Sequence, residues 1–171
     1  MSKRIYLIGY MGVGKSTWGK KWASSSKLAF LDLDSRLEEI FNMSISDYIA
    51  QYGELAFRKA ERQALKDTAG FEGIISVGGG TPCFYDNMVE MNRLGMTVYL
   101  HASIGFLSHR LVDSFRAGKE RPLLLGVPID EYPEFIGKHL FERQPYYRLA
   151  KLIIQVEKVD VLEALSGIQI K

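Results

Sequence analysis

The amino-acid sequence predicts an α/β fold in which helices flank both faces of a five-stranded parallel sheet. Five short apolar segments, each expected to form a buried strand, alternate with segments of helical period, at residues 5–8, 28–34, 73–77, 96–101 and 151–156. Parallel strands are covered on both faces, so they are near-continuous apolar runs rather than alternating ones. A glycine-rich loop also follows the first apolar run, at the end of the strand where open α/β sheets bind ligands.

The glycine-rich loop predicts a nucleotide site. Residues 9–16 are Gly-Tyr-Met-Gly-Val-Gly-Lys-Ser, which matches the phosphate-binding pattern G-x-x-x-x-G-K-[ST]. Glycine lets successive backbone N–H groups turn toward one anion, and the helix expected over 16–26 adds its own free N–H groups. We expect Lys15 to reach the β- and γ-phosphates and the Ser16 hydroxyl to bind Mg²⁺.

Two carboxylates end the second strand. Asp32 and Asp34 are two residues apart, and such residues of a strand point to the same side, so both are expected to face one site. The alternative is an aspartate turn that provides an N-cap for the next helix. Beside a phosphate loop we favour the functional interpretation.

Residues 35–69 are helical in pattern, with breaks near Asn42 and at 52–53 and a longer helix from about Glu54. On that helix Arg58 and Glu61 are three residues apart and can pair, which would fix the direction of the arginine. An ordinary surface salt bridge is the alternative for this pair.

The third strand, 73–77, leads into Gly78, Gly79 and Gly80. Adjacent glycines cost backbone entropy on ordering, so we expect this backbone to lie close to a ligand.

Helices are expected over 85–93 and 103–112. The segment from about 113 to 124 contains several cations and no apolar period, which makes it a candidate lid; the cations are Arg116, Lys119 and Arg121.

The rest of the chain predicts a helix over 128–143, a break over 143–147, and a closing helix over 159–167 after the last strand.

Trp18 and Trp22 are four residues apart on one face of the first helix and are expected to pack against the sheet. Cys83 is expected to be a packed thiol. His101, His109 and His139 lack the spacing of a structural metal site.

Composition sets the broad class. The chain has 171 residues and a net charge of +2, with a single cysteine. This length predicts one domain with a proper core. So small a charge gives no reason to expect nucleic acid or an anionic membrane as partner. No segment has the pattern of a signal peptide or a membrane span. We expect a cytoplasmic enzyme.

Taken together, the motifs resemble the shikimate kinase family, which has the nucleoside-monophosphate-kinase-like P-loop fold. The resemblance runs from the first strand to about residue 157 and adds several motifs to the phosphate loop and Asp32-x-Asp34. They are Gly53-Glu54-x-x-Phe57-Arg58-x-x-Glu61, Gly78-Gly79-Gly80, Leu107-x-x-Arg110, Arg121-Pro122 and Arg143-x-Pro145-x-Tyr147.

This resemblance implies a three-layer P-loop kinase fold within a single domain, 1–171. It places a helical substrate-binding insertion at about 33–61 and a mobile lid at about 112–125. The implied activity is transfer of the γ-phosphoryl of ATP to the 3-hydroxyl of shikimate, giving shikimate 3-phosphate and ADP on the route to chorismate and aromatic amino acids. The implied partners are shikimate, ATP and Mg²⁺, with no nucleic acid or membrane, and the implied state is a monomer.

The resemblance also implies individual roles, of which Lys15, Asp34 and Arg121 are the catalytic ones. ATP would be held by Gly12, Val13, Gly14, Lys15, Ser16, Thr17, Arg110 and Arg121. Shikimate would be held by Asp34, Arg58, Gly79, Gly80 and Arg143, with both arginines on its carboxylate. Mg²⁺ would be held by Ser16 and, through water, by Asp32. Asp34 would orient the attacking hydroxyl, and whether it also accepts the proton stays open. Arg121 would close over the transferring phosphate.

Two positions depart from the family pattern. Leu33 stands where a small polar residue is common, and we expect it to point away from the site. Asn42 replaces a usual glycine, and asparagine tolerates a left-handed backbone.

Two other functions are compatible with a phosphate loop. One is a different kinase of the same fold, acting on gluconate or a nucleotide; the paired Arg58 and Arg143 suit a small polyhydroxy carboxylate better. The other is a nucleotide-binding regulatory protein without turnover, which has no need of a complete catalytic set.

Overall fold

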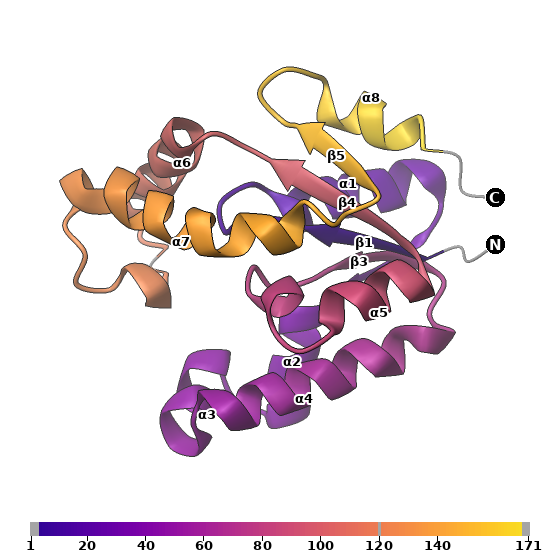
Figure 1. Ribbon diagram of the computed structural model, residues 1–171, viewed down its shortest axis with the longest axis horizontal. Coiled ribbons are helices and arrows are strands. Elements are labelled where there is room, and N and C mark those ends of the chain that lie inside the picture. Colours follow the sequence, from indigo (N-terminus) through magenta and orange to yellow (C-terminus); the bar gives the residue numbers. More distant parts are fainter. Residues whose placement is uncertain (1–3, 120, 169–171) are drawn as a thin grey trace.

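The computed structural model describes residues 4–119 and 121–168. Its centre is a sheet of five parallel strands in the order β2-β3-β1-β4-β5 (Figure 1). The strands are β1 Arg4–Ile8, β2 Ala29–Asp32, β3 Gly73–Ser76, β4 Met96–His101 and β5 Leu152–Gln155. Each hydrogen-bonded pair of strands is parallel, so the predicted α/β fold with a five-stranded parallel sheet is confirmed.

The helices connect these strands and flank the sheet. They are α1 Lys15–Ser26, α2 Leu33–Phe41, α3 Ile45–Tyr52, α4 Glu54–Asp67, α5 Asn87–Leu94, α6 Ile104–Arg116, α7 Tyr132–Tyr147 and α8 Val161–Ser166. Short 3₁₀ turns lie at Thr68–Gly70, Thr81–Cys83, Pro122–Leu124 and Ile129–Glu131. No helix among the described residues is both long and apolar enough to span a bilayer.

The central strand β1 is buried on both faces. A Cβ placed on Gly19 of α1 would lie 3.0 Å from Leu7 Cδ1, so Leu7 faces α1 at close range. On the opposite face, the Tyr6 hydroxyl lies 2.7 Å from Thr68 Oγ1, just after α4. Helices therefore cover both sides of the sheet, which explains why this strand is an uninterrupted apolar run.

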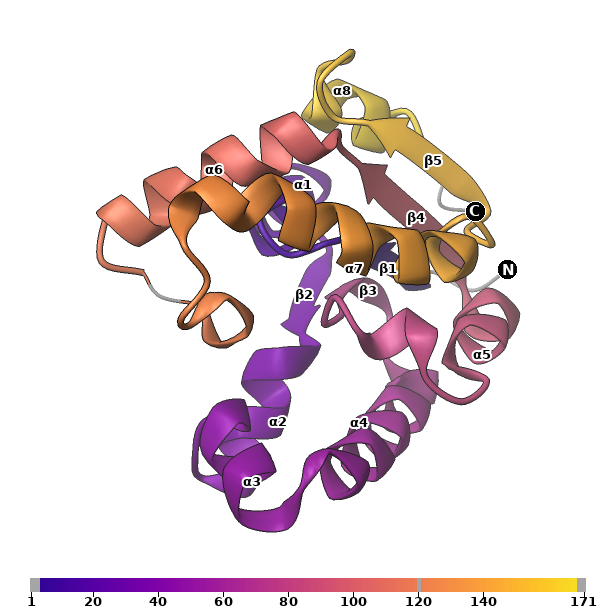
Figure 2. The ribbon, with the colours of Figure 1, turned by 60° about the vertical axis from the view of Figure 1, so that its left-hand side comes forward.

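Two helical arms extend beyond the carboxyl ends of the strands (Figure 2). Helices α2, α3 and α4 form one arm, which leaves the sheet at the end of β2. Helices α6 and α7, with the segment between them, form the other. The loop after β1 lies at this end of the sheet, so the phosphate loop is placed between the two arms.

The second strand is shorter than predicted. β2 ends at Asp32, and α2 begins at Leu33, so Asp34 lies in the first turn of a helix and not on a strand. Asp32 is the N-cap of α2, because its side chain accepts a hydrogen bond from the Ser35 N–H at 3.3 Å. Aspartate is favoured at this position because its carboxylate satisfies a free N–H of the first turn.

Two helices end later than predicted. Helix α6 continues to Arg116 rather than stopping near 112, so the first part of the predicted lid is helical. Helix α7 continues to Tyr147, through the break predicted at 143–147. Pro145 removes only the hydrogen bond to the carbonyl of Phe141, whose side chain is 83% exposed, while the buried Tyr147 anchors the last turn.

Three local expectations are confirmed. Asn42 ends α2 in the left-handed conformation, with φ of 53°. Trp22 is fully buried and Trp18 packs against the core as a half-buried side chain. Leu33 is also buried in the core, pointing away from the polar groups around Asp32.

Candidate active site

The phosphate loop has the backbone that its glycines predict. Gly9, Gly12 and Gly14 have φ of 145°, 83° and 99°, in the region that favours glycine. A Cβ on Gly9 would also lie 2.7 Å from the carbonyl oxygen of Leu100. Gly14 is the residue that precedes α1, so the free N–H groups of this helix face the loop. The loop thus has the conformation of an anion site.

Lys15 folds over this loop. Its Nζ donates to the carbonyl oxygens of Gly9 at 2.8 Å and Tyr10 at 3.2 Å. Burial lowers the pKa of Lys15 to about 8, although the carboxylates of Asp34 and Asp32 act in the opposite direction. At neutral pH Lys15 is therefore still mostly protonated, and the negative charge of a bound phosphate would favour this charged form further.

Oxygen atoms from three elements meet beside Lys15. The Ser16 hydroxyl donates to Asp32 Oδ2 at 2.5 Å and lies 3.2 Å from the Ser76 hydroxyl. Asp32 and Ser76 are register partners at the ends of β2 and β3. Hydroxyl and carboxylate oxygens are the donors that Mg²⁺ prefers, so this set fits that ion.

Asp34 reaches the same region from α2. A Cβ on Gly78 would lie 2.7 Å from Asp34 Oδ1. The carboxylate therefore rests against the loop formed by Gly78, Gly79 and Gly80, called the glycine loop below. Burial raises the pKa of Asp34 to about 6, and the charge of Lys15 acts against this rise. Asp32 and Asp34 therefore converge as predicted, but the turn from β2 into α2 brings them together, not the alternation of a strand.

The three glycines leave room for side chains. A Cβ on Gly80 would lie 2.8 Å from Arg58 Nη2, and a Cβ on Gly79 would lie 3.7 Å from Arg143 Nη1. Gly80 has φ of −86°, which any residue can adopt, so space rather than backbone freedom requires glycine here. The loop is thus flanked by two guanidinium groups, from α4 and from α7.

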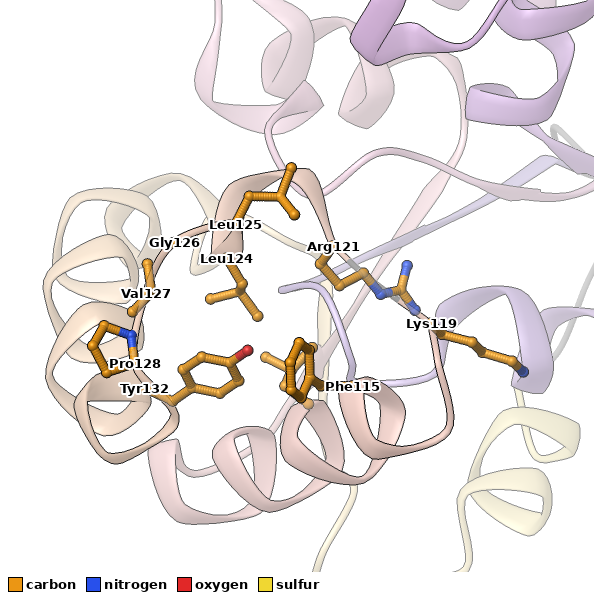
Figure 3. A pocket seen from close by; sticks show the side chains of 10 residues that line it. Phe115, Lys119, Arg121, Leu124, Leu125, Gly126, Val127, Pro128 and Tyr132 are labelled. Atoms are coloured by element: carbon orange, nitrogen blue, oxygen red, sulfur yellow. The ribbon is translucent and has the colours of Figure 1, made fainter.

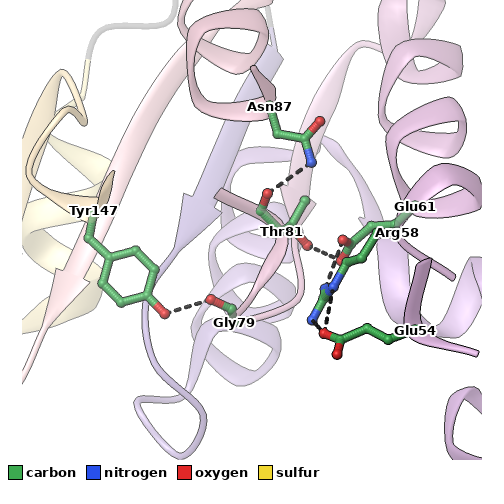
Figure 4. Close-up of polar contacts among 7 residues, drawn as sticks. All are labelled: Glu54, Arg58, Glu61, Gly79, Thr81, Asn87 and Tyr147. Carbon is green, nitrogen blue, oxygen red and sulfur yellow. Dashed lines mark hydrogen bonds and ion pairs between the residues drawn. The ribbon is translucent and has the colours of Figure 1, made fainter. Parts of the chain in front are cut away.

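Arg58 is held by two carboxylates and an aromatic ring. It pairs with Glu61 at 2.9 Å and with Glu54 at 3.3 Å (Figure 4). Its guanidinium lies 3.9 Å from the centre of the Phe84 ring. The Glu61 side chain is only 1% exposed, so the alternative of a surface salt bridge is wrong. This arrangement fixes the direction of Arg58.

Arg143 is held differently. Its guanidinium lies 5.7 Å from the centre of the ring of Tyr10, a residue of the phosphate loop. Within residues 4–119 and 121–168, none of the ion pairs includes Arg143. Its positive charge therefore has no ion-pair partner among these residues.

The remaining predicted ATP residues lie around the loop and at α6. A Cβ on Gly14 would lie 3.7 Å from Arg110 Nη1, so Arg110 borders the start of α1. Val13 is buried in the core, which leaves only its backbone for a nucleotide, while Thr17 is exposed.

Arg121 lies on the segment between α6 and α7. It lines a cavity of about 370 Å³ together with Lys119 and several apolar side chains (Figure 3). The apolar side chains include Leu111, Phe115, Leu124 and Tyr132. The charge of Arg121 also acts to lower the pKa of Lys15, which places it within electrostatic reach of the phosphate loop.

Some residues of the site were not predicted from the sequence. The Thr81 hydroxyl donates to Glu61 at 2.6 Å, and Asn87 Nδ2 donates to the carbonyl of Thr81 at 2.9 Å. The Tyr147 hydroxyl donates to the carbonyl of Gly79 at 2.6 Å. Side chains from α4, α5 and α7 thereby hold the glycine loop in place (Figure 4). The bonds Thr81–Glu61 and Tyr147–Gly79 join residues 20 and 68 positions apart in the chain, so no local pattern indicates them.

Comparison with known proteins agrees with this geometry. The protein-family model "Shikimate kinase" matches residues 11–166. The shikimate kinase of Parabacteroides distasonis is 43% identical over 158 residues, which cover 92% of this chain and 90% of that protein.

Two solved structures are similar over nearly the whole chain. The crystal structure of shikimate kinase from Bacteroides thetaiotaomicron has a TM-score of 0.86 and 41% identity, covering 95% of this chain and 93% of that one. Shikimate kinase from Acinetobacter baumannii in complex with shikimate has a TM-score of 0.83 and 27% identity, covering 96% and 89%. On this sequence and structural similarity, the chain belongs to the shikimate kinase family.

Proposed function

We infer that this protein is a shikimate kinase, which transfers the γ-phosphoryl of ATP to the 3-hydroxyl of shikimate on the route to chorismate. The observation that carries this inference is the pair of guanidinium groups, Arg58 and Arg143, on either side of Gly79 and Gly80. The pair lies next to the phosphate loop with Lys15 and Asp34. Two cations beside a phosphoryl donor site suit an acceptor that has both a carboxylate and a hydroxyl.

Phosphoryl transfer needs positioning and charge neutralisation more than covalent chemistry. The amides of Gly12, Val13 and Gly14 hold the phosphates, with Lys15 on the β- and γ-phosphates. Ser16 and, through water, Asp32 would hold Mg²⁺, which would supply neutralisation of the phosphate charge. The oxygen atoms of Ser16, Asp32 and Ser76 lie together and could bind a cation, which supports this proposal.

Asp34 orients the attacking 3-hydroxyl. With a pKa near 6 it is ionised at neutral pH and still basic enough to accept the hydroxyl proton as the bond to phosphorus forms. Arg58 and Arg143 bind the carboxylate, and the Gly79 and Gly80 amides meet other groups of the ring.

The rest of the chain completes the site around both substrates. Arg110 lies along the nucleotide base, Thr17 borders the phosphates, and Arg121 closes over the transferring phosphoryl. We propose one domain over 1–171, with a substrate-binding arm at about 33–61 and a lid at about 112–125, acting as a cytoplasmic monomer.

A coupled assay of ADP release tests this function. With Mg-ATP present, we compare shikimate, gluconate, AMP and no acceptor. Release that depends on shikimate alone is the expected result. Release with gluconate or AMP instead would assign the chain to another kinase activity of the same fold.

A further inference from the structure

The glycine loop lies between Arg58 and Arg143, the two arginines proposed to bind the acceptor carboxylate and together called the carboxylate clamp. A Cβ on Gly79 would lie 3.6 Å from the Gly9 carbonyl oxygen and the Met11 N, and 3.7 Å from Arg143 Nη1. Gly79 is therefore packed between the phosphate loop and Arg143. The next residue, Gly80, lies against Arg58. A shift of this loop would change the position of each guanidinium relative to the other.

Tyr147 is bonded to this loop at its centre. Its hydroxyl donates to the Gly79 carbonyl at 2.6 Å, and its ring is fully buried, 5.0 Å from the centre of the Tyr99 ring. Burial raises the pKa of Tyr147 far above its usual value, so the phenol keeps its proton and stays a donor. Because the side chain is enclosed, it does not itself reach a bound substrate.

Tyr147 and Arg143 lie on the same side of one helix. They are four residues apart on α7, so their side chains are neighbours. The Tyr147 hydrogen bond thus connects the helix that carries Arg143 to the loop that borders Arg58. On the other side, Glu61 and Asn87 hold Thr81, and Glu61 also holds Arg58 (Figure 4).

We propose that Tyr147 is a positioning residue that sets the separation of Arg58 and Arg143 through the Gly79 carbonyl, and so determines affinity for the acceptor carboxylate. This inference rests on the proposed function. It adds a role for a side chain that touches neither ATP nor the acceptor. Its hydroxyl donates to the loop of Gly78, Gly79 and Gly80 and not to the phosphate loop, so the larger effect should fall on the acceptor side of the site.

The test uses Tyr147→Phe, which keeps the ring and removes the donor. We expect the KM for shikimate to rise roughly tenfold, since the half-buried Gly79 carbonyl loses its hydrogen-bond donor and is free to shift. The KM for ATP and kcat should stay within about twofold. The control is Tyr6→Phe, which removes another buried tyrosine hydrogen bond, to Thr68 at 2.7 Å, outside the proposed site. It should leave both KM values unchanged.

A double-mutant cycle separates positioning from general support of the fold. If Tyr147 acts by aligning Arg143 with Arg58, Tyr147→Phe should change the shikimate KM by less than about twofold in an Arg143→Ala background. An equal rise in both backgrounds, or an equal rise in the KM for ATP, would overturn the proposal.

Two further measurements keep the test decisive. Thermal unfolding is followed for every variant, and kinetics are run about ten degrees below the lowest midpoint, so that loss of fold is not read as loss of affinity. Hydrogen exchange in residues 78–83 without substrate should be faster in Tyr147→Phe than in wild type; unchanged exchange would contradict the role of the Gly79 bond. If wild type itself shows no shikimate-dependent turnover, the proposed function fails, and the exchange result still decides whether Tyr147 holds the loop.

Discussion

The Ser16 hydroxyl donates to the Asp32 carboxylate at 2.5 Å, which ties the first turn of α1 to the end of β2. Asp32 also caps α2 through the Ser35 N–H. One side chain therefore serves both the helix and the proposed cation site. The two interpretations of this aspartate, as an N-cap and as a functional group, are compatible.

Asp32→Asn separates the two roles. Asparagine caps a helix as well as aspartate does, so stability should change by less than about 1 kcal/mol. It lacks the negative charge, so the Mg²⁺ concentration that gives half-maximal rate should rise on the order of tenfold or more, while the KM for shikimate changes little. Titration of the rate with Mg²⁺ measures this. An unchanged Mg²⁺ dependence would remove Asp32 from the cation site.

Asp34→Asn should lower activity and raise stability. Loss of a general base costs on the order of 10²–10⁴ in kcat. In the ligand-free protein the pKa of Asp34 is raised from 3.8 to about 6, so ionising it opposes folding as the pH rises through this window. Above pH 6 the variant should be more stable by roughly 1–3 kcal/mol, and near pH 4 the difference should vanish. Denaturant unfolding at the two pH values measures this; equal stability at pH 7 would contradict the burial argument.

The rate should depend on pH at both ends of the neutral range. We expect kcat/KM to fall below about pH 6, as Asp34 gains a proton, and above about pH 8, as Lys15 loses one. These two groups interact, so the apparent values belong to the pair. A pH profile with shikimate as the varied substrate measures them. In Asp34→Asn the acid limb should disappear, and its persistence would assign that limb to another group.

Arg58→Ala and Arg143→Ala should both raise the KM for shikimate, on the order of 10²-fold, because each removes a charge-assisted contact to the carboxylate. The KM for ATP should change little. Stability should distinguish them. Arg58→Ala leaves the buried Glu61 without its ion-pair partner and should be the more destabilising by about 2 kcal/mol or more. Similar loss of ATP affinity would show that these arginines belong to the nucleotide side.

Local patterns predicted the fold class and the position of the phosphate loop. Apolar runs and glycines gave the strands and the phosphate loop, because these depend on neighbours in sequence. The prediction that the second strand continues from Asp32 to Asp34 was wrong, because α2 begins at Leu33 with Asp32 as its N-cap. The end of α7 was also wrong, because burial of Tyr147 offsets the cost of Pro145.

The contacts of Thr81 and Asn87 could not be predicted, because they join separate helices to one loop. The same is true of the bond between Tyr147 and Gly79, which spans 68 residues. Such contacts depend on how helices pack, which no short pattern in this chain records.

The most direct measurement of the carboxylate clamp compares shikimate with its uncharged methyl ester. We expect the wild type to lose on the order of 10²-fold or more in kcat/KM on the ester, since two arginines then face a neutral group. Arg58→Ala and Arg143→Ala should lose activity on shikimate but discriminate far less between acid and ester. If every protein discriminates to the same degree, Arg58 and Arg143 do not bind the carboxylate, and the account of this site is wrong.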